Sequence, residues 1–176
     1  MGFLFSGKKM QQKRAEVQEN PAMAGNQEQI NKEQTVLIPE CIRIGLKSVT
    51  KNEAIEMAGQ LLVDGGYVTP EYITAMKERE KVLSTYIGEG VAIPHGVGNS
   101  KDQIIHSGIC ILQFPEGVEY QEGEKAYLVV GIAGKDNQHL KILSALAEFI
   151  QESEALKQLF TTGDRDYIFQ AFTNRF

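Results

Sequence analysis

The sequence has little of several features that commonly define a protein class. It contains no tryptophan and two cysteines, Cys41 and Cys110, which form neither a C-x-x-C pair nor a zinc-ligand spacing. Both lie in apolar segments, so we predict buried free thiols rather than a disulfide. No apolar run approaches the roughly 20 residues that a membrane-spanning helix needs, and no signal-peptide pattern begins the chain. These absences favour a cytoplasmic protein.

The common catalytic sequence motifs are also missing. There is no G-x-S-x-G around Ser84 or Ser100, no H-E-x-x-H, and no glycine run that ends in Gly-Lys-Ser or Gly-Lys-Thr. The sequence therefore gives no support to a serine hydrolase, a compact zinc site or a P-loop. With three histidines in all, a metal site would have to recruit scattered carboxylates. A metal-binding or purely structural α/β domain stays a weaker alternative.

Length and charge suit one acidic domain with a tail. The chain has 176 residues, 42% of them hydrophobic, and a formal net charge of -5. The negative charge argues against nucleic acid as a partner. Residues 1–35 are rich in Lys, Gln, Glu and Asn and poor in large apolar residues, which predicts a flexible N-terminal tail or linker. The folded domain is expected over residues 36–176.

Hydrophobic periodicity predicts strands that alternate with helices. Apolar runs predict strands at 91–93, 103–114, 118–120 and 126–133, with shorter extended segments at 36–38 and 41–46. Helices are expected to begin at the capping residues Thr50, Thr69, Asp136, Ser153 and Asp164. This alternation predicts an α/β domain whose buried central sheet is covered by helices on both faces.

Three details of this pattern can be checked against a structure. Pro115-Glu116-Gly117 predicts a turn after the strand at 103–114. The run at 126–133 is the most apolar and is the candidate for the central strand. In the helix after Asp136, the residues expected to face inward are Leu140, Leu143, Ala147 and Ile150.

The stretch from Ser84 to Gly98 reads S-T-Y-I-G-E-G-V-A-I-P-H-G-V-G and centres on His95. The apolar run at 91–93 predicts a short strand that leads into a turn, and Pro94 favours an extended residue before it. Glycines on both sides permit positive φ and the close approach of a partner. A polar side chain just past a strand end is a common arrangement for a functional residue. A structural histidine in a tight turn is an equally open interpretation.

The other two histidines differ in context. His106 falls inside the predicted strand beside apolar residues, which favours a structural role. His139 falls in the first turn of the helix after the predicted central strand. In α/β sheets, ligands bind outside the carboxyl ends of the strands, and a helix N-terminus favours an anion. If the strand before His95 lies next to the central strand, the imidazoles of His95 and His139 converge.

A converging histidine pair without metal or nucleotide motifs suits histidine as the nucleophile. A neutral imidazole is available near pH 7 and can attack phosphorus to form a covalent phosphohistidine. Backbone N–H groups of a glycine-rich turn and an arginine would bind the phosphoryl oxygens, and a second histidine would stabilise them during transfer. No ATP, metal or other cofactor is required if the phosphoryl group arrives already activated.

Three runs of the sequence resemble a known family. S-T-Y-I-G-E-G-V-A-I-P-H-G resembles the active-site signature of the enzyme IIA components of the phosphoenolpyruvate-dependent sugar phosphotransferase system (PTS), mannitol/fructose type. I-C-I-L-Q-F-P-E-G-V-E-Y and L-V-V-G-I-A-G-K-D-N-Q-H-L are similar to the mannitol branch. The resemblance covers about residues 36–176 and implies a mixed sheet flanked by helices.

The resemblance also implies roles for four residues. His95 matches the histidine that accepts a phosphoryl group from the phosphocarrier protein HPr, and His139 matches a second histidine that assists the transfer. Arg79 and Glu89 match charged residues near the phosphorylated histidine. Their plainer interpretations are a solvated helix-end cation and a turn residue. In the family, a cysteine of the IIB component then receives the phosphoryl group and phosphorylates the incoming sugar, and the association with the membrane component IIC is indirect.

Two functions stay open within this resemblance. The first is a phosphotransferase for the uptake of mannitol or a related polyol, and the second is a regulatory module of the nitrogen-PTS type that acts through its phosphorylation state. The runs Q-F-P-E-G and D-N-Q-H-L favour the first. Because no cysteine matches the IIB acceptor and no membrane span is present, we expect IIA alone, as a free subunit or as part of a longer permease. The polyol itself is recognised on another component.

Overall fold

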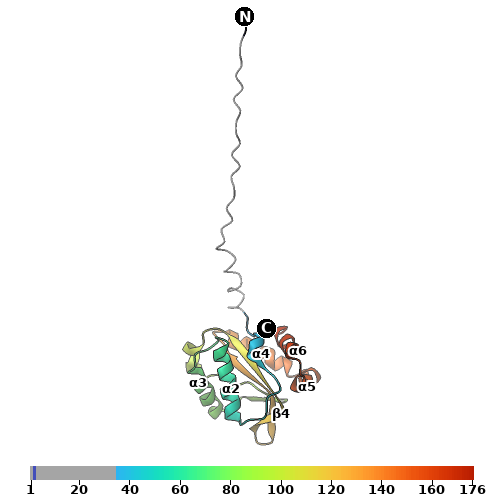
Figure 1. Ribbon diagram of the computed structural model, residues 1–176. Coiled ribbons are helices and arrows are strands. Elements are labelled where there is room, and N and C mark those ends of the chain that lie inside the picture. The colour runs from blue at the N-terminus through green and yellow to red at the C-terminus, as the bar shows by residue number, and fades with distance from the viewer. Residues whose placement is uncertain (1, 3–34) are drawn as a thin grey trace. The chain divides into compact units, whose positions relative to one another are not determined.

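The computed structural model describes residue 2 and residues 35–176, and Figure 1 shows how its elements are arranged. The tail predicted over residues 1–35 lies, apart from residues 2 and 35, outside the described residues. In chain order the elements are η2 (Pro39–Cys41), β1 (Ile42–Arg43), α2 (Lys51–Asp64), α3 (Tyr72–Val82), β2 (Tyr86–Gly88), β3 (Val91–Ala92), η3 (Gly98–Gln103), β4 (Gly108–Gln121), β5 (Glu124–Ala133), α4 (Gln138–Phe149), α5 (Ser153–Thr161) and α6 (Arg165–Thr173).

Five strands form one mixed sheet in the order β1-β4-β5-β3-β2. β4 and β5 make a long antiparallel hairpin, β1 pairs parallel with β4, and β3 pairs parallel with β5. β2 completes the far edge, antiparallel to β3. β5 therefore has a neighbour on each side and is buried along most of its length, as its apolar run predicts. The mixed sheet of an α/β domain is confirmed.

Helices cover both faces of this sheet (Figure 1). α2 packs on β4 and β5 and lies beside α3, while α5 packs on the same two strands. Side chains of β4 distinguish the two faces: the Cys110 thiol donates to Ala58 O of α2 at 3.2 Å, whereas Gln113 Nε2 donates to Leu159 O of α5 at 2.7 Å. Residues three apart in a strand point to opposite faces, so α2 and α5 lie on opposite sides.

The predicted helix caps are partly confirmed. Thr50 and Glu53 form the complete capping box at the start of α2, and the Asp164 carboxylate accepts from two backbone N–H groups of α6. Ser153 does not cap α5, because it is the first helical residue and Glu152 occupies the N-cap position. α3 begins at Tyr72 rather than directly after Thr69, since the intervening residues form a turn.

The turn predicted at Pro115-Glu116-Gly117 is wrong. β4 continues through it, and the pairing of β4 with β5 shifts register between Gln113 and Val118. A bulge accommodates extra residues in one strand without ending it, and it is a position that tolerates proline. Pairing then resumes because Val118 and Tyr120 are buried on the core side of the hairpin.

The strand predicted from residue 103 begins later than expected. Residues 98–103 form η3, and Ile104 makes one isolated antiparallel bridge with Val68. His106 is therefore not in a strand: it is exposed in a bend before β4, and its N–H donates to Tyr67 O at 3.1 Å. Ile104 is buried and covers the core from this loop, whereas Ile105 is 43% exposed. A run of apolar residues does not by itself distinguish such a loop from a strand.

The buried face of α4 also differs from the prediction. Ile142, Leu146 and Phe149 are buried, whereas Leu140 is 66% exposed. Asp136 is not the N-cap; it adopts φ 54°, and Asn137 precedes the first helical residue. Apolar residues occur at helical spacing on two adjacent faces of this helix, and packing against the sheet determines which face is buried.

The structure bears on two further predictions, the state of the cysteines and the absence of a membrane-spanning helix. Cys41 and Cys110 are buried free thiols, as predicted. Burial is the main reason that the pKa of Cys41 rises to about 11, so this thiol stays protonated near pH 7. Among the described residues, no helix is both long enough and apolar enough to cross a bilayer.

The capping box gives a direct test of the fold. We expect Thr50→Ala to lower the free energy of unfolding by about 1 kcal/mol, because it removes the Thr50 Oγ1 acceptor for Glu53 N. Ser153→Ala is the matched control and should change this free energy by less than about 0.5 kcal/mol. Urea denaturation at pH 7 measures both, and equal losses would contradict the assignment of the caps.

Candidate active site

The parallel pairing of β3 with β5 brings two turns of the chain together. The ladder between these strands continues as a bridge between His95 and Ile132. His95 follows β3, and His139 lies in the first turn of α4, just after β5. The centroids of the two rings are 5.2 Å apart, and the ring planes are tilted by 54°. The imidazoles therefore converge, as the pairing of their strands requires.

Both histidines line one cavity of about 510 Å³. Its polar lining residues are Tyr72, Arg79, Ser100, Lys101, Asp136 and Asn137, and its apolar ones are Val82, Val97, Ile104 and Leu140. Arg79 and Lys101 supply two cations against one carboxylate, that of Asp136. The cavity thus favours an anion, although the whole chain carries a net charge of -5.

The His95 ring is held by its own backbone. Its Nδ1 lies 2.7 Å from the carbonyl oxygen of Ile93. A carbonyl can only accept, so Nδ1 carries the proton, and in the neutral ring Nε2 keeps a free lone pair. Nε2 is therefore the ring nitrogen with a lone pair for a nucleophilic reaction.

Tyr72 fixes the turn that carries His95. The hydroxyl of this buried residue donates to Ile132 O at 2.9 Å and accepts from Gly96 N at 2.9 Å. A Cβ at Gly96 would lie 2.5 Å from the Tyr72 ring, so glycine is required here by close approach. No sequence pattern singles out the hydroxyl of Tyr72.

His139 is positioned by a similarly close contact. A Cβ at Gly134 would come within 2.4 Å of the Cα of His139, so the end of β5 meets the start of α4 with no room for a side chain. The ring of His139 is thereby placed in the wall of the cavity, next to the ring of His95.

Burial sets the protonation of the pair. It lowers the pKa of both His95 and His139 below the ordinary value of 6.5. For His95 the hydrogen bond to Ile93 and the charge of Glu80 act in the opposite direction, while His139 and Arg79 lower its pKa further. Both rings are therefore mainly neutral near pH 7, and His95 Nε2 is available for attack.

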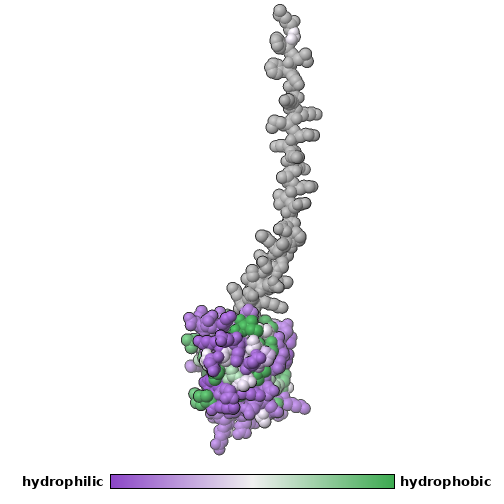
Figure 2. Space-filling view, turned by 90° about the vertical axis from the view of Figure 1, so that its left-hand side faces the viewer, coloured by the Kyte–Doolittle hydropathy of each residue, from purple (hydrophilic) through white to green (hydrophobic). Residues whose placement is uncertain are grey.

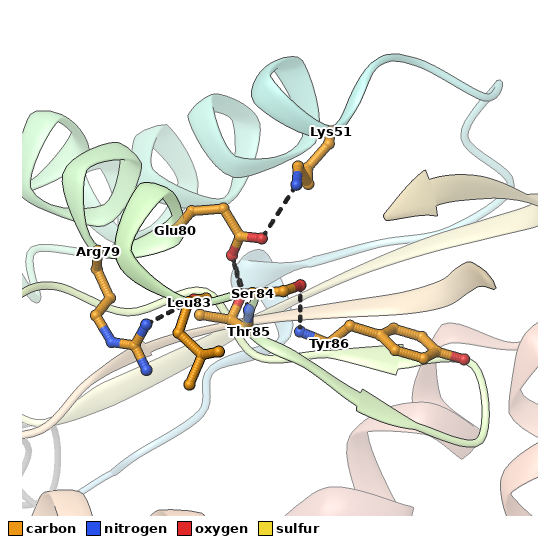
Figure 3. A network of polar contacts seen from close by, with 7 residues as sticks. All are labelled: Lys51, Arg79, Glu80, Leu83, Ser84, Thr85 and Tyr86. Carbon is orange, nitrogen blue, oxygen red and sulfur yellow. Dashed lines mark hydrogen bonds and ion pairs between the residues drawn. The ribbon is translucent and has the colours of Figure 1, made fainter. Parts of the chain in front are cut away.

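The two predicted charged residues lie in different places. Arg79, in the last turn of α3, lines the cavity, and its Nη1 donates to Leu83 O at 2.7 Å (Figure 3). Its planar guanidinium carries further donors that suit a phosphoryl group. Glu89 sits in the turn between β2 and β3 with φ 48° and lines a separate cavity beside Tyr86 and Tyr127. The structure does not bring Glu89 to the histidines, and its role stays a prediction.

Lys101 and Asn137 are cavity residues that the sequence reasoning missed. Their nearness to His95 and His139 along the chain is the signal that could have suggested them. Within the part of the chain that the structure describes, no three His, Cys, Asp or Glu side chains form a group that could hold a metal ion. Neutral imidazoles beside cationic side chains define a class of site that suits covalent phosphoryl transfer by histidine.

Comparison with known proteins identifies the family. Residues 35–175 match the family model described as "Phosphoenolpyruvate-dependent sugar phosphotransferase system, EIIA 2". The chain belongs to this family, and the resemblance of its signature is confirmed.

Relatives and solved structures agree with this assignment. The mannitol-specific phosphotransferase enzyme IIA component of Bacillus subtilis is 47% identical over 137 residues, which cover 78% of this chain and 96% of that protein. The mannitol-specific EIICBA component of Pasteurella multocida is 45% identical over 132 residues, 73% of this chain but 21% of that protein. Enzyme IIA-mannitol of Escherichia coli, in a complex with phosphorylated enzyme IIB-mannitol, matches with a TM-score of 0.75 and 39% identity over 79% of this chain and 98% of that one.

The electrostatics of the pair can be tested by NMR titration. We expect both His95 and His139 to titrate below pH 6.5, because burial disfavours their charged forms. His139→Gln should raise the pKa of His95, since it removes a neighbour that lowers this pKa. Ring carbon and nitrogen shifts followed from pH 4 to 8 measure both effects. A His95 midpoint at or above 6.5 in the unaltered protein would contradict the neutral pair.

Proposed function

We propose that this chain is the IIA phosphocarrier of a mannitol-type PTS. It accepts a phosphoryl group from phospho-HPr on His95 and passes it to a cysteine of a IIB component. The observation that carries the proposal is the cavity itself, in which His95 Nε2 is free, His139 lies beside it, and Arg79 and Lys101 supply positive charge. The identity of 47% with a mannitol-specific IIA component supports the substrate class.

The first step is an attack of His95 Nε2 on phosphorus. The bond between Nε2 and phosphorus forms while the bond from phosphorus to HPr breaks, so the step needs no nucleotide or metal ion as a further reactant. The ring then carries a phosphoryl group on Nε2 and a proton on Nδ1, and it is positively charged. The Ile93 carbonyl, 2.7 Å from Nδ1, stabilises this charge by accepting the proton's hydrogen bond.

The phosphoryl oxygens carry negative charge during this step. His139, Arg79 and Lys101 line the same cavity and can donate to them. In the second step the IIB thiolate attacks phosphorus, the Nε2–phosphorus bond breaks, and the His95 ring returns to its neutral form. His139 assists both steps by donating to the oxygens, because it remains beside His95 in each.

HPr and IIB must reach the same imidazole, so they bind one after the other at overlapping sites. Exposed apolar side chains border the cavity: Val82 is 78% exposed and Leu140 is 66% exposed. Figure 2 shows a face of the molecule that is mainly hydrophilic with separate apolar patches. Small apolar contacts of this kind suit transient complexes.

The remaining assignments follow from the same proposal. The protein acts in the cytoplasm and meets the membrane component IIC through IIB. Residues 1–35 are a tail or linker before the IIA domain of residues 36–176, and the start of the family match at residue 35 supports this boundary. The regulatory alternative is disfavoured by the identity with mannitol-specific IIA components.

Phosphorylation tests the proposal directly. After incubation with phosphoenolpyruvate, enzyme I and HPr, the protein should gain the mass of one phosphate in an acid-labile form, because a phosphoramidate on His95 hydrolyses in acid. His95→Ala should gain nothing. His106→Ala is the matched control, since His106 is exposed in a bend outside the cavity, and should be phosphorylated as the unaltered protein is. A labelled His95→Ala protein would refute the assignment.

Transfer to IIB tests the assisting histidine and the substrate class. We expect His139→Ala to slow transfer to a mannitol IIB domain by roughly 100- to 1000-fold, as loss of one transition-state donor does in other enzymes. Quench-flow from the purified phosphoprotein measures the rate, and circular dichroism confirms the fold. An unchanged rate would remove His139 from the mechanism. If the unaltered phosphoprotein transfers nothing to mannitol IIB, the regulatory function is favoured instead.

A further inference from the structure

We propose that Glu80 is a positioning residue for phosphoryl transfer: acting through Thr85 and Ile93, its buried carboxylate holds the His95 ring in the orientation and tautomer that leave Nε2 free. The inference rests on the proposed function of His95. It concerns a residue outside the cavity, on the buried side of α3, that neither the sequence motifs nor the cavity lining indicated.

Four hydrogen bonds connect the carboxylate to the nucleophile. Glu80 Oε2 accepts from Thr85 N at 2.9 Å and from Thr85 Oγ1 at 2.5 Å (Figure 3). Thr85 O accepts from Ile93 N at 2.9 Å, which extends the β2–β3 pairing by one rung. Ile93 O then accepts from His95 Nδ1 at 2.7 Å. Each group in this series is fixed by the one before it.

The series matters because β3 is short. It has two residues, and the chain from Ile93 to His95 continues beyond it. On the β5 side this continuation is held by Ile132, whose N–H donates to Pro94 O at 3.0 Å. On the other side the neighbour is Thr85, which precedes β2 and is itself held by Glu80. The hydrogen bonds of the Glu80 carboxylate to Thr85 therefore fix the chain from Ile93 to His95 on the side away from β5.

Burying the carboxylate of Glu80 costs free energy. It is 7% exposed, and in the described part of the chain its Oε1 has no hydrogen bond; the compensation is the charge of Lys51, whose Nζ lies 3.4 Å away (Figure 3). A buried charge is costly even when paired, and an apolar residue would often serve stability as well. If this residue served only to hold α2 and α3 together, a carboxylate would thus not be required at this position.

The negative charge of Glu80 favours the phosphorylated form of His95. The ring of His95 becomes positive when Nε2 is phosphorylated, and a negative group nearby favours that state. Glu80 is the carboxylate that acts on His95 in this sense, against His139 and Arg79, which act in the opposite sense. Glu80 therefore has two effects on His95: its hydrogen bonds orient the ring before attack, and its charge stabilises the positive ring after phosphorylation.

The test compares two substitutions at Glu80. Glu80→Gln keeps an acceptor for Thr85 but removes the charge, and Glu80→Ala removes both. Nitrogen shifts of the His95 ring at pH 8 report the tautomer in the unphosphorylated protein, and quench-flow with phospho-HPr gives the maximal rate and the HPr concentration at half-maximal rate. We expect Glu80→Ala to populate the second tautomer and to lower the maximal rate roughly 10- to 100-fold, as loss of a group that orients a reacting histidine does.

Glu80→Gln should keep the tautomer, lower the pKa of His95, and reduce the maximal rate less than Glu80→Ala does. In both variants the half-saturating HPr concentration should stay unchanged, because Glu80 is buried and does not contact HPr. Glu78→Gln is the matched control: Glu78 lies on the same helix, its side chain is 55% exposed and pairs with Lys81, and its loss should change nothing.

A folded Glu80→Ala protein with the original tautomer and rate would overturn the proposal. If Glu80→Ala does not fold, an unchanged rate and an unchanged His95 pKa in Glu80→Gln would overturn it equally. A rise in the half-saturating HPr concentration at constant maximal rate would also do so, since it would indicate docking rather than positioning. If the unaltered protein accepts no phosphoryl group, the proposed function fails, while the tautomer comparison still decides the structural part.

Discussion

The pairing of β3 with β5 is the constraint on which the site depends. β3 contributes two residues, and its alignment with the buried β5 determines where the chain beyond it runs. The bridge between His95 and Ile132 extends that alignment to the histidine. His139 follows β5 on the same edge, so one short parallel ladder places two residues 44 positions apart in the sequence with their rings 5.2 Å apart.

The site combines low polarity around the rings with positive charge at the wall. Burial keeps His95 and His139 neutral, which a nucleophile needs. Arg79 and Lys101 then provide the charge that a phosphoryl group requires. Because the reaction is an exchange between proteins, the cavity must also open to solvent, and the exposed apolar residues at its border mark where partners are expected to approach.

The errors of sequence reasoning share a physical origin. An apolar run does not specify which element forms: residues 104–106 fit the pattern of a strand, but they lie in a loop in which only Ile104 is buried. In α4 two apolar frames coexist, and only the sheet decides which one is buried. At Pro115 the local signal for a turn is overridden because the flanking segments still pair with β5. Local propensity loses to tertiary packing in each case.

The sequence by itself determined the class of the domain, the ends of several helices, the central strand and the two histidines of interest, because periodicity, capping residues and the signature are local properties of the chain. Only the tertiary structure decided that the imidazoles meet, that Glu89 lies in another cavity, and that Lys101 and Tyr72 belong to the site. It also revealed the path from Glu80 to His95, since a buried carboxylate looks like any other glutamate until its partners are in place.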